Sequence, residues 1–154
     1  RITAENEQSP KPLNTSPATN TSYADAFFDF GKNYRYFVRT ISLGTESQPV
    51  ESLESEAVAI SPVDTFPPAP PSAITVAASP GTISIFFAVN LEKDVAGYRI
   101  YRSTDRNLPK NEWRQITPDL LKTNTFQDST VEAGTEYFYF LTAVDTAGNV
   151  SQPS

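Results

Sequence analysis

The sequence contains no cysteine, no histidine and no methionine. It therefore has no thiol nucleophile, no imidazole base, no disulfide and no zinc site built from thiolates or imidazoles. Only a carboxylate-based or a serine–lysine mechanism stays open to such a chain. We predict that the chain is not an enzyme and that it has no catalytic residues, no metal site and no cofactor.

Long apolar runs and basic clusters are also missing. No stretch approaches the ~18 consecutive apolar residues that a membrane span requires. No signal peptide is visible, so any export signal would lie upstream of Arg1. The chain has 12 basic and 18 acidic residues, a net charge of −6, and the acidic residues are scattered. We therefore expect no nucleic-acid partner and interpret the acidity as an aid to solubility.

The most informative stretch begins at Gly134 and continues with β-forming residues to Asp145. Side chains alternate along a strand, so every second residue from Tyr137 shares one face. A similar stretch begins at Gly31. The matched positions, at a constant offset of 103 residues, are Gly31 with Gly134, Tyr34 with Tyr137, Tyr36 with Tyr139, and Val38 with Leu141. This internal repeat indicates two copies of one β-rich domain, because its period is too long for a solenoid.

A proline-rich stretch at residues 63–71 separates the copies, because prolines cannot donate ladder hydrogen bonds and favour extended geometry. We therefore divide the chain into residues 1–62, a linker at 63–71 and residues 72–154. Short strands bounded by turns are expected throughout, and no segment has a helical pattern. We expect a short strand and a turn within residues 23–30, and strands at residues 34–42, 58–60, 74–76, 82–90, 98–102, 113–117 and 137–145.

Three motifs in the second copy resemble bacterial fibronectin type III domains: AGYRIYR at 96–102, GTEY at 134–137 and AVDTAGN at 143–149. The resemblance implies tandem all-β, immunoglobulin-like sandwiches from an exported bacterial protein, secreted or in the cell envelope. It also implies that Tyr34 and Tyr137 are tyrosine-corner residues, whose hydroxyls bond nearby backbone. The family usually carries Trp on its second strand, where this chain has Phe87.

The register of the repeat predicts incomplete domains. After a gap in the polar loop, Arg1 aligns with Arg102, so residues 1–62 correspond to the C-terminal part of a domain. Residues 149–154 align with residues 50–55, which places Ser154 on Ser55, so residues 72–154 lack most of a last strand. We expect the chain to be a segment of a longer polypeptide. The alternative is a short chain whose partial domain is completed by a strand from a partner.

Aromatic residues on the outer face of the second copy form a candidate protein-contact patch. Alternation places Phe138 and Phe140 outward, beside Tyr101 on the neighbouring strand and with Trp113 at the rim. Aromatic residues commonly anchor protein interfaces. The alternative is that the polar loop 103–112, with Leu108 and Pro109, folds over these rings.

Other polar groups are weaker candidates. The carboxylates of Glu92, Asp94 and Asp128 could serve hydrolysis or weak calcium binding, but turns often carry acidic residues and no EF-hand spacing is present. Three tripeptides match the N-glycosylation acceptor, with exposed turns as the simpler interpretation. These tripeptides begin at Asn14, Asn20 and Asn149.

The leading functional hypothesis is a non-catalytic, extracytoplasmic structural or protein-binding module. In this hypothesis a fragment of a longer exported protein docks in an envelope or membrane-associated assembly. One alternative is a pair of spacer domains in a secreted multi-domain enzyme such as a polysaccharide hydrolase. Another is a carbohydrate-binding or adhesive module that uses Trp113 and exposed tyrosines.

Overall fold

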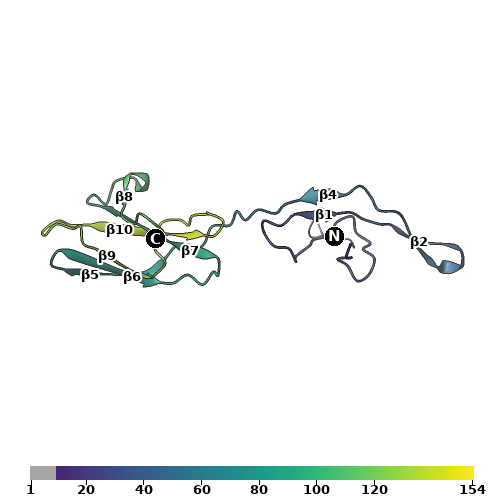
Figure 1. Ribbon diagram of the computed structural model, residues 1–154, viewed down its shortest axis with the longest axis horizontal. Coiled ribbons are helices and arrows are strands. Elements are labelled where there is room, and N and C mark those ends of the chain that lie inside the picture. Colours follow the sequence, from purple (N-terminus) through teal and green to yellow (C-terminus); the bar gives the residue numbers. More distant parts are fainter. Residues whose placement is uncertain (1–9) are drawn as a thin grey trace. The chain divides into compact units, whose positions relative to one another are not determined.

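The computed structural model describes residues 10–154, and Figure 1 shows them as β-strands with only two single-turn 3-10 helices. The all-β prediction is confirmed. The chain divides between Asp64 and Thr65 into two compact units, called unit 1 and unit 2 below. The alignment of Arg1 with Arg102 concerns a residue outside the described part of the chain.

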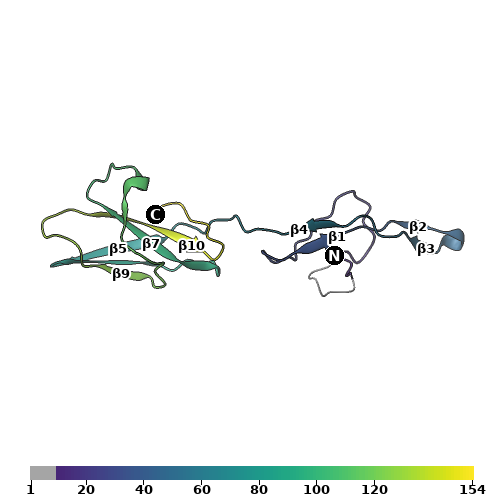
Figure 2. The same cartoon turned by 45° about the horizontal axis from the view of Figure 1, so that its top comes forward.

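Unit 1 contains two short antiparallel pairs. Strand β1 (Tyr34–Tyr36) pairs with β4 (Val58–Ile60), and β2 (Ile41–Leu43) pairs with β3 (Pro49–Glu51). The 3-10 turn η1 (Thr45–Ser47) joins β2 to β3, which lie side by side in Figure 2.

The short strand expected within residues 23–30 is absent, since the first strand in residues 10–154 begins at Tyr34. The expected continuous strand over residues 34–42 is also wrong, because the ladder is interrupted after Tyr36. In the gap, the backbone N–H of Val38 donates to Ser55 Oγ at 3.0 Å, and that of Thr40 donates to Ser52 Oγ at 2.9 Å. Serine side chains thus replace carbonyl acceptors, so the two segments stay together without a regular ladder.

Unit 2 is built from two three-stranded antiparallel sheets, which Figure 1 shows as two layers. One sheet has the order β5–β6–β9 and the other β10–β7–β8. Its elements are β5 (Ser72–Ser79), β6 (Thr82–Ala88), β7 (Val95–Ser103), η2 (Lys110–Glu112), β8 (Arg114–Gln115), β9 (Thr125–Asp128) and β10 (Phe138–Asp145).

The core of unit 2 lies between these sheets and follows the alternation of the strands. The residues of the core cluster are Ile85 and Phe87 of β6, Tyr98 and Ile100 of β7, and Leu141 and Ala143 of β10. Burying a residue such as Ile or Leu stabilises the fold by about 1.5–3 kcal/mol relative to leaving it exposed. The ring of Phe87 packs edge-on against that of Tyr98, with centroids 4.6 Å apart.

Glycine permits a tight turn and a close backbone contact in unit 2. Pro80 and Gly81 form the turn between β5 and β6, where Gly81 takes a φ of 74°. At Gly97, with a φ of 157°, an added Cβ would lie 2.7 Å from the Leu121 carbonyl oxygen. The backbone of Leu121 bonds that of Tyr98 in both directions at 2.9 Å, so glycine permits this contact.

Candidate functional site

Three of the four aromatic residues of the predicted contact patch, Tyr101, Trp113 and Phe140, lie together at the sheet that contains β7 and β10. The rings of Tyr101 and Phe140 are stacked with centroids 4.6 Å apart and an interplanar angle of 11°. The ring of Trp113 lies 5.2 Å from that of Phe140. Phe138 and Tyr101 are half-buried.

Two of the four side chains in the patch are buried. Phe140 is 4% exposed and Trp113 is 5% exposed. The indole N–H of Trp113 donates to the Leu108 carbonyl at 2.8 Å, and Lys110 Nζ lies 3.6 Å from the centroid of the Trp113 ring. The alternative, in which the 103–112 loop covers the rings, is what the structure shows. A contact role for these four residues stays a prediction.

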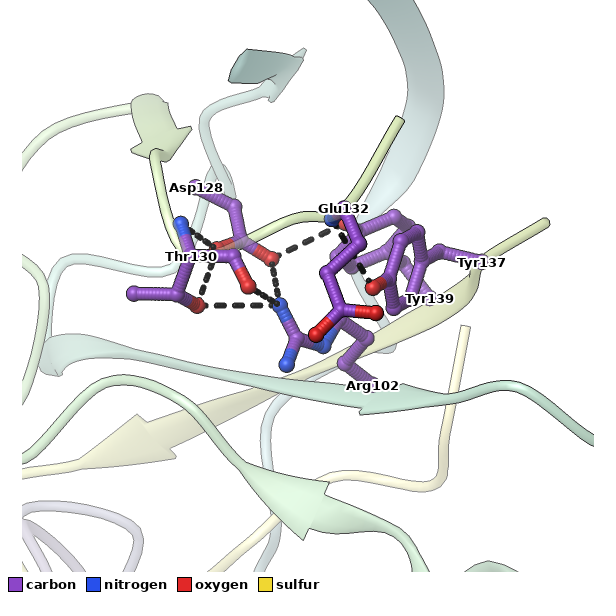
Figure 3. Close-up of polar contacts among 6 residues, drawn as sticks. All are labelled: Arg102, Asp128, Thr130, Glu132, Tyr137 and Tyr139. Atoms are coloured by element: carbon purple, nitrogen blue, oxygen red, sulfur yellow. Dashed lines mark hydrogen bonds and ion pairs between the residues drawn. The ribbon is translucent and has the colours of Figure 1, made fainter. Parts of the chain in front are cut away.

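A second cluster, here called the arginine network, joins Arg102, Asp128, Thr130 and Tyr139 at one end of unit 2 (Figure 3). Arg102 Nη1 donates to Asp128 Oδ2 at 2.7 Å and to Thr130 Oγ1 at 3.0 Å. Tyr139 Oη also donates to Asp128 Oδ2, at 2.9 Å. The other carboxylate oxygen, Oδ1, accepts from the Thr130 N–H at 3.0 Å and from its hydroxyl at 2.7 Å.

The charges of the arginine network are mutually stabilised. Burial raises the pKa of Asp128, but hydrogen bonds from Thr130, Arg102 and Tyr139 outweigh this, so the net pKa lies below its ordinary value. Burial, followed by the bond to Asp128, raises the pKa of Tyr139, so this hydroxyl remains a neutral donor. Burial lowers the pKa of Arg102, but its contacts with Asp128 give a net increase.

The side chains of Arg102 and Asp128 are only 11% and 2% exposed, and both carboxylate oxygens are engaged. The guanidinium carbon also lies 4.7 Å from the centroid of the Tyr137 ring, a favourable cation–π distance. The cluster therefore contains an acid that is fully partnered and no activated nucleophile. It is suited to hold the ends of β7, β9 and β10 together.

The hydroxyls of Tyr34 and Tyr137 contact backbone five residues upstream. The Asp29 N–H donates to Tyr34 Oη at 2.7 Å, and the Glu132 N–H donates to Tyr137 Oη at 3.1 Å. Tyr34 is 1% exposed, whereas Tyr137 is half-buried. Each hydroxyl thus satisfies a turn N–H and fixes how the chain enters β1 or approaches β10.

The weaker polar candidates have local structural contacts. Glu92 accepts from the Ala69 N–H at 2.8 Å, a bond that lowers the pKa of Glu92. The Asp94 carbonyl accepts from the Thr146 N–H at 2.9 Å, and the Asp94 side chain is exposed. Asp128 belongs to the arginine network, so Glu92 and Asp128 bind different groups.

The three acceptor asparagines differ in environment. Asn149 is half-buried, and its N–H and Nδ2 donate to the Asp145 carboxylate at 2.8 Å and 2.9 Å. Asn14 is exposed and donates from Nδ2 to the Ser16 carbonyl at 2.8 Å, while Asn20 is exposed. These contacts are typical of turns.

Sequence reasoning missed the arginine network, because Arg102 and Asp128 are 26 residues apart. One signal could have revealed it. The repeat aligns Asp25 with Asp128 and Tyr36 with Tyr139. In unit 1 the Tyr36 hydroxyl donates to Asp25 Oδ2 at 2.9 Å, so this aspartate–tyrosine pair is a repeated feature.

The two stacked antiparallel sheets of unit 2 define an immunoglobulin-like β-sandwich. The FN1–FN3 domains of chicken CNTN1 have a similar structure, with a TM-score of 0.52 and 18% identity over 86% of this chain and 43% of that one. An Fn3-like protein from Clostridium thermocellum has a TM-score of 0.49 and 24% identity over 58% of this chain and 88% of that one. The chain has the fibronectin type III fold, which confirms the resemblance seen in the sequence.

Exoglucanase B of Cellulomonas fimi is 30% identical to the chain over 142 residues, which cover 89% of this chain. The chain spans only 12% of the length of that enzyme. No family model matches the chain. The described residues include no helix that is long and apolar enough to cross a membrane.

Proposed function

We propose that the chain is a non-catalytic part of a longer, exported bacterial enzyme that acts on glucan. In this proposal the fibronectin type III-like units are spacers that hold other domains apart. The observation that carries the proposal is the 30% identity to an exoglucanase. The matched region covers 89% of this chain but only 12% of the length of that enzyme. A match of that extent is expected for an accessory region.

The polar clusters of unit 2 support a structural role. In the arginine network, the Asp128 carboxylate accepts hydrogen bonds from Arg102, Thr130 and Tyr139. This arrangement leaves no titratable group of the network poised to transfer a proton to a substrate. The aromatic rings are engaged in the same way, because a loop backbone and Lys110 cover Trp113. Both clusters therefore make contacts within unit 2 that suit a structural role.

The docking hypothesis is favoured less than the spacer hypothesis. Its supporting feature was an open aromatic face, and Phe140 and Trp113 are buried. The carbohydrate-binding hypothesis also relied on Trp113, whose ring already contacts Lys110 rather than open solvent. A spacer needs neither surface, since its function depends on length and stiffness.

The test compares three forms of the natural full-length protein: unaltered, with unit 2 removed, and with unit 2 replaced by an unrelated β-sandwich of equal length. We expect the rate of hydrolysis of soluble glucan oligosaccharides to differ by no more than about twofold among the three forms, because no contact with the transition state is lost. On insoluble glucan, the deletion should lower the rate and the replacement should restore it.

The isolated 154-residue chain provides the complementary measurement. We expect no release of reducing ends from glucan by this chain alone. Turnover by the isolated chain, or loss of soluble-substrate hydrolysis after removal of unit 2, would contradict a non-catalytic role. Failure of the unrelated sandwich to restore the rate on insoluble glucan would instead indicate a specific binding surface on unit 2.

A further inference from the structure

Two serine contacts show that Val38 of unit 1 and Leu141 of unit 2 occupy equivalent places. Val38 N–H donates to Ser55 Oγ at 3.0 Å, and Ser55 N–H donates back to the Val38 carbonyl at 2.9 Å. Leu141 makes the same two bonds with Ser154, both at 3.0 Å. The equivalence therefore rests on matched contacts as well as on the sequence repeat.

A second matched contact lies two residues earlier. The Tyr36 hydroxyl donates to Asp25 and the Tyr139 hydroxyl donates to Asp128, both at 2.9 Å. Each of these aspartates also accepts, through Oδ1, a backbone N–H from two residues further along the chain at 3.0 Å. The two units thus share one local architecture around β1 and β10.

The surroundings of the matched residues differ. Leu141 is 0% exposed, whereas Val38 is 72% exposed. Val58 and Ile60 of β4, which pair directly with the two tyrosines of β1, are 60% and 48% exposed. Directly paired residues of antiparallel strands share a face. Tyr34 on this face is already covered, at 1% exposure, so the exposed part consists of Val38, Val58 and Ile60, here called the open face of unit 1.

The cover over Leu141 in unit 2 comes from β6 and β7. Ile85, Phe87 and Ile100 belong to the same core cluster as Leu141, and Ile100 is its direct ladder partner. Among residues 10–154, β1 pairs only with β4, so the described part of unit 1 has no counterpart of β7. The repeat therefore specifies what would cover the open face: strands with an apolar residue at every second position.

We propose that the open face of unit 1 is covered by a β-segment of the same polypeptide that has the side-chain pattern of residues 72–101. The last strand of this segment adds antiparallel to the edge of β1, as β7 adds to β10. Unit 2 supports a source within the polypeptide, because β5, β6 and β7 precede β10 in one continuous chain. This proposal rests on the exposure of matched residues and, like the proposed function, requires a polypeptide longer than this chain, but the labelling test below can fail while the spacer function holds.

The absence of native cysteine makes single-cysteine labelling a clean test. The thiol-modification rate is measured for Val38→Cys and Leu141→Cys, first in the 154-residue chain and then with a copy of residues 67–101 fused ahead of Arg1. Leu141→Cys gives the reference rate for a covered position. We expect Val38→Cys to react fast in the 154-residue chain and at least about tenfold more slowly with the added copy, because a covered thiol reacts only when the structure opens.

The matched control is the same fusion with Ile85→Asp and Phe87→Asp in the added copy only, which should restore fast labelling. Val58→Cys provides a second position on the open face in case Val38→Cys impairs folding. Equal labelling with and without the intact copy at both positions would overturn the proposal. Equal protection of the thiol by the control copy would also overturn the proposal. Protection that rises with concentration in the unfused chain would also overturn it, by showing that a second molecule covers the face.

Discussion

Removal of the charge on Asp128 should destabilise unit 2 through the arginine network. In Asp128→Asn, Arg102 keeps its buried position but loses its counter-ion, and Tyr139 loses a charged acceptor. Loss of one partner from a buried ion pair costs about 3–5 kcal/mol. Arg102 retains its bond to Thr130 Oγ1, so we expect a decrease of about 2–4 kcal/mol in the free energy of unfolding.

The assay is urea unfolding followed by tryptophan fluorescence. Trp113 is the single tryptophan of the chain and is buried in unit 2, so its emission reports on that unit. Asp119→Asn, at an exposed position, is the matched control and should change the unfolding free energy by less than about 0.5 kcal/mol. A loss below about 0.5 kcal/mol for Asp128→Asn itself would refute the account of the network.

The same variant predicts a pH dependence. The folded-state pKa of Asp128 lies below its ordinary value, so its stabilising effect is complete above the unfolded-state pKa of about 3.9. The effect is lost as the pH falls through the lower, folded-state pKa. The difference in stability between wild type and Asp128→Asn should therefore be constant from pH 7 to about pH 5 and shrink below about pH 4. A difference that persists unchanged at low pH would contradict a charge-based origin.

Three further predictions concern unit 2. Phe140→Ala should lower the unfolding free energy by about 3–4 kcal/mol, because this ring is 4% exposed. Phe138→Ala, at a half-buried ring, should cost less than half as much, and equal costs in urea unfolding would contradict the loop-covered arrangement. Gly97→Ala should lower the unfolding free energy by more than about 2 kcal/mol, because the added Cβ would clash with backbone. Gly134→Ala has open space around it and should lower the unfolding free energy by only about 1–2 kcal/mol, an order that thermal unfolding of both variants checks. Tyr137→Phe should cost about 0.5–1.5 kcal/mol by removing the acceptor of a turn N–H, and hydrogen exchange of that amide should become faster.

The strand pattern of unit 2 was largely predictable because alternation is a local property. Leu141 lies on the face that every second residue from Tyr137 was expected to share, and it is buried in the core with Ile85 and Phe87. The interruption between Tyr36 and Ile41 was not predictable from β-propensity. It depends on serine side chains from residues 52 and 55, which come from a distant part of the sequence.

The burial of the aromatic patch was also beyond local reasoning. Alternation places Phe140 on the outer side of a sheet, but it does not say what covers that side. The cover comes from a loop whose Leu108 carbonyl meets the indole N–H and whose Lys110 lies against the rings. Such contacts depend on the path of a polar loop, which composition alone leaves open.

The arginine network shows the same limit for polar groups. Asp128 was considered as one of three carboxylates near turns, and its partner on β7 was not identified. The register of β7 and β10 brings Arg102 beside Tyr139, whereas Asp128 lies on β9 of the other sheet, so the cluster also depends on how the two sheets pack. Only the repeated spacing from Asp25 to Tyr36 and from Asp128 to Tyr139 carried a signal in the sequence.

The most direct test of the central claim is the intact mass and both terminal sequences of the natural polypeptide that contains these residues. A non-catalytic part of a longer glucan-degrading enzyme predicts a mass well above the 16.9 kDa of this chain, with the hydrolytic activity in residues outside it. A natural polypeptide of 16.9 kDa would contradict the claim, and the open face of unit 1 would then have to be covered by another molecule.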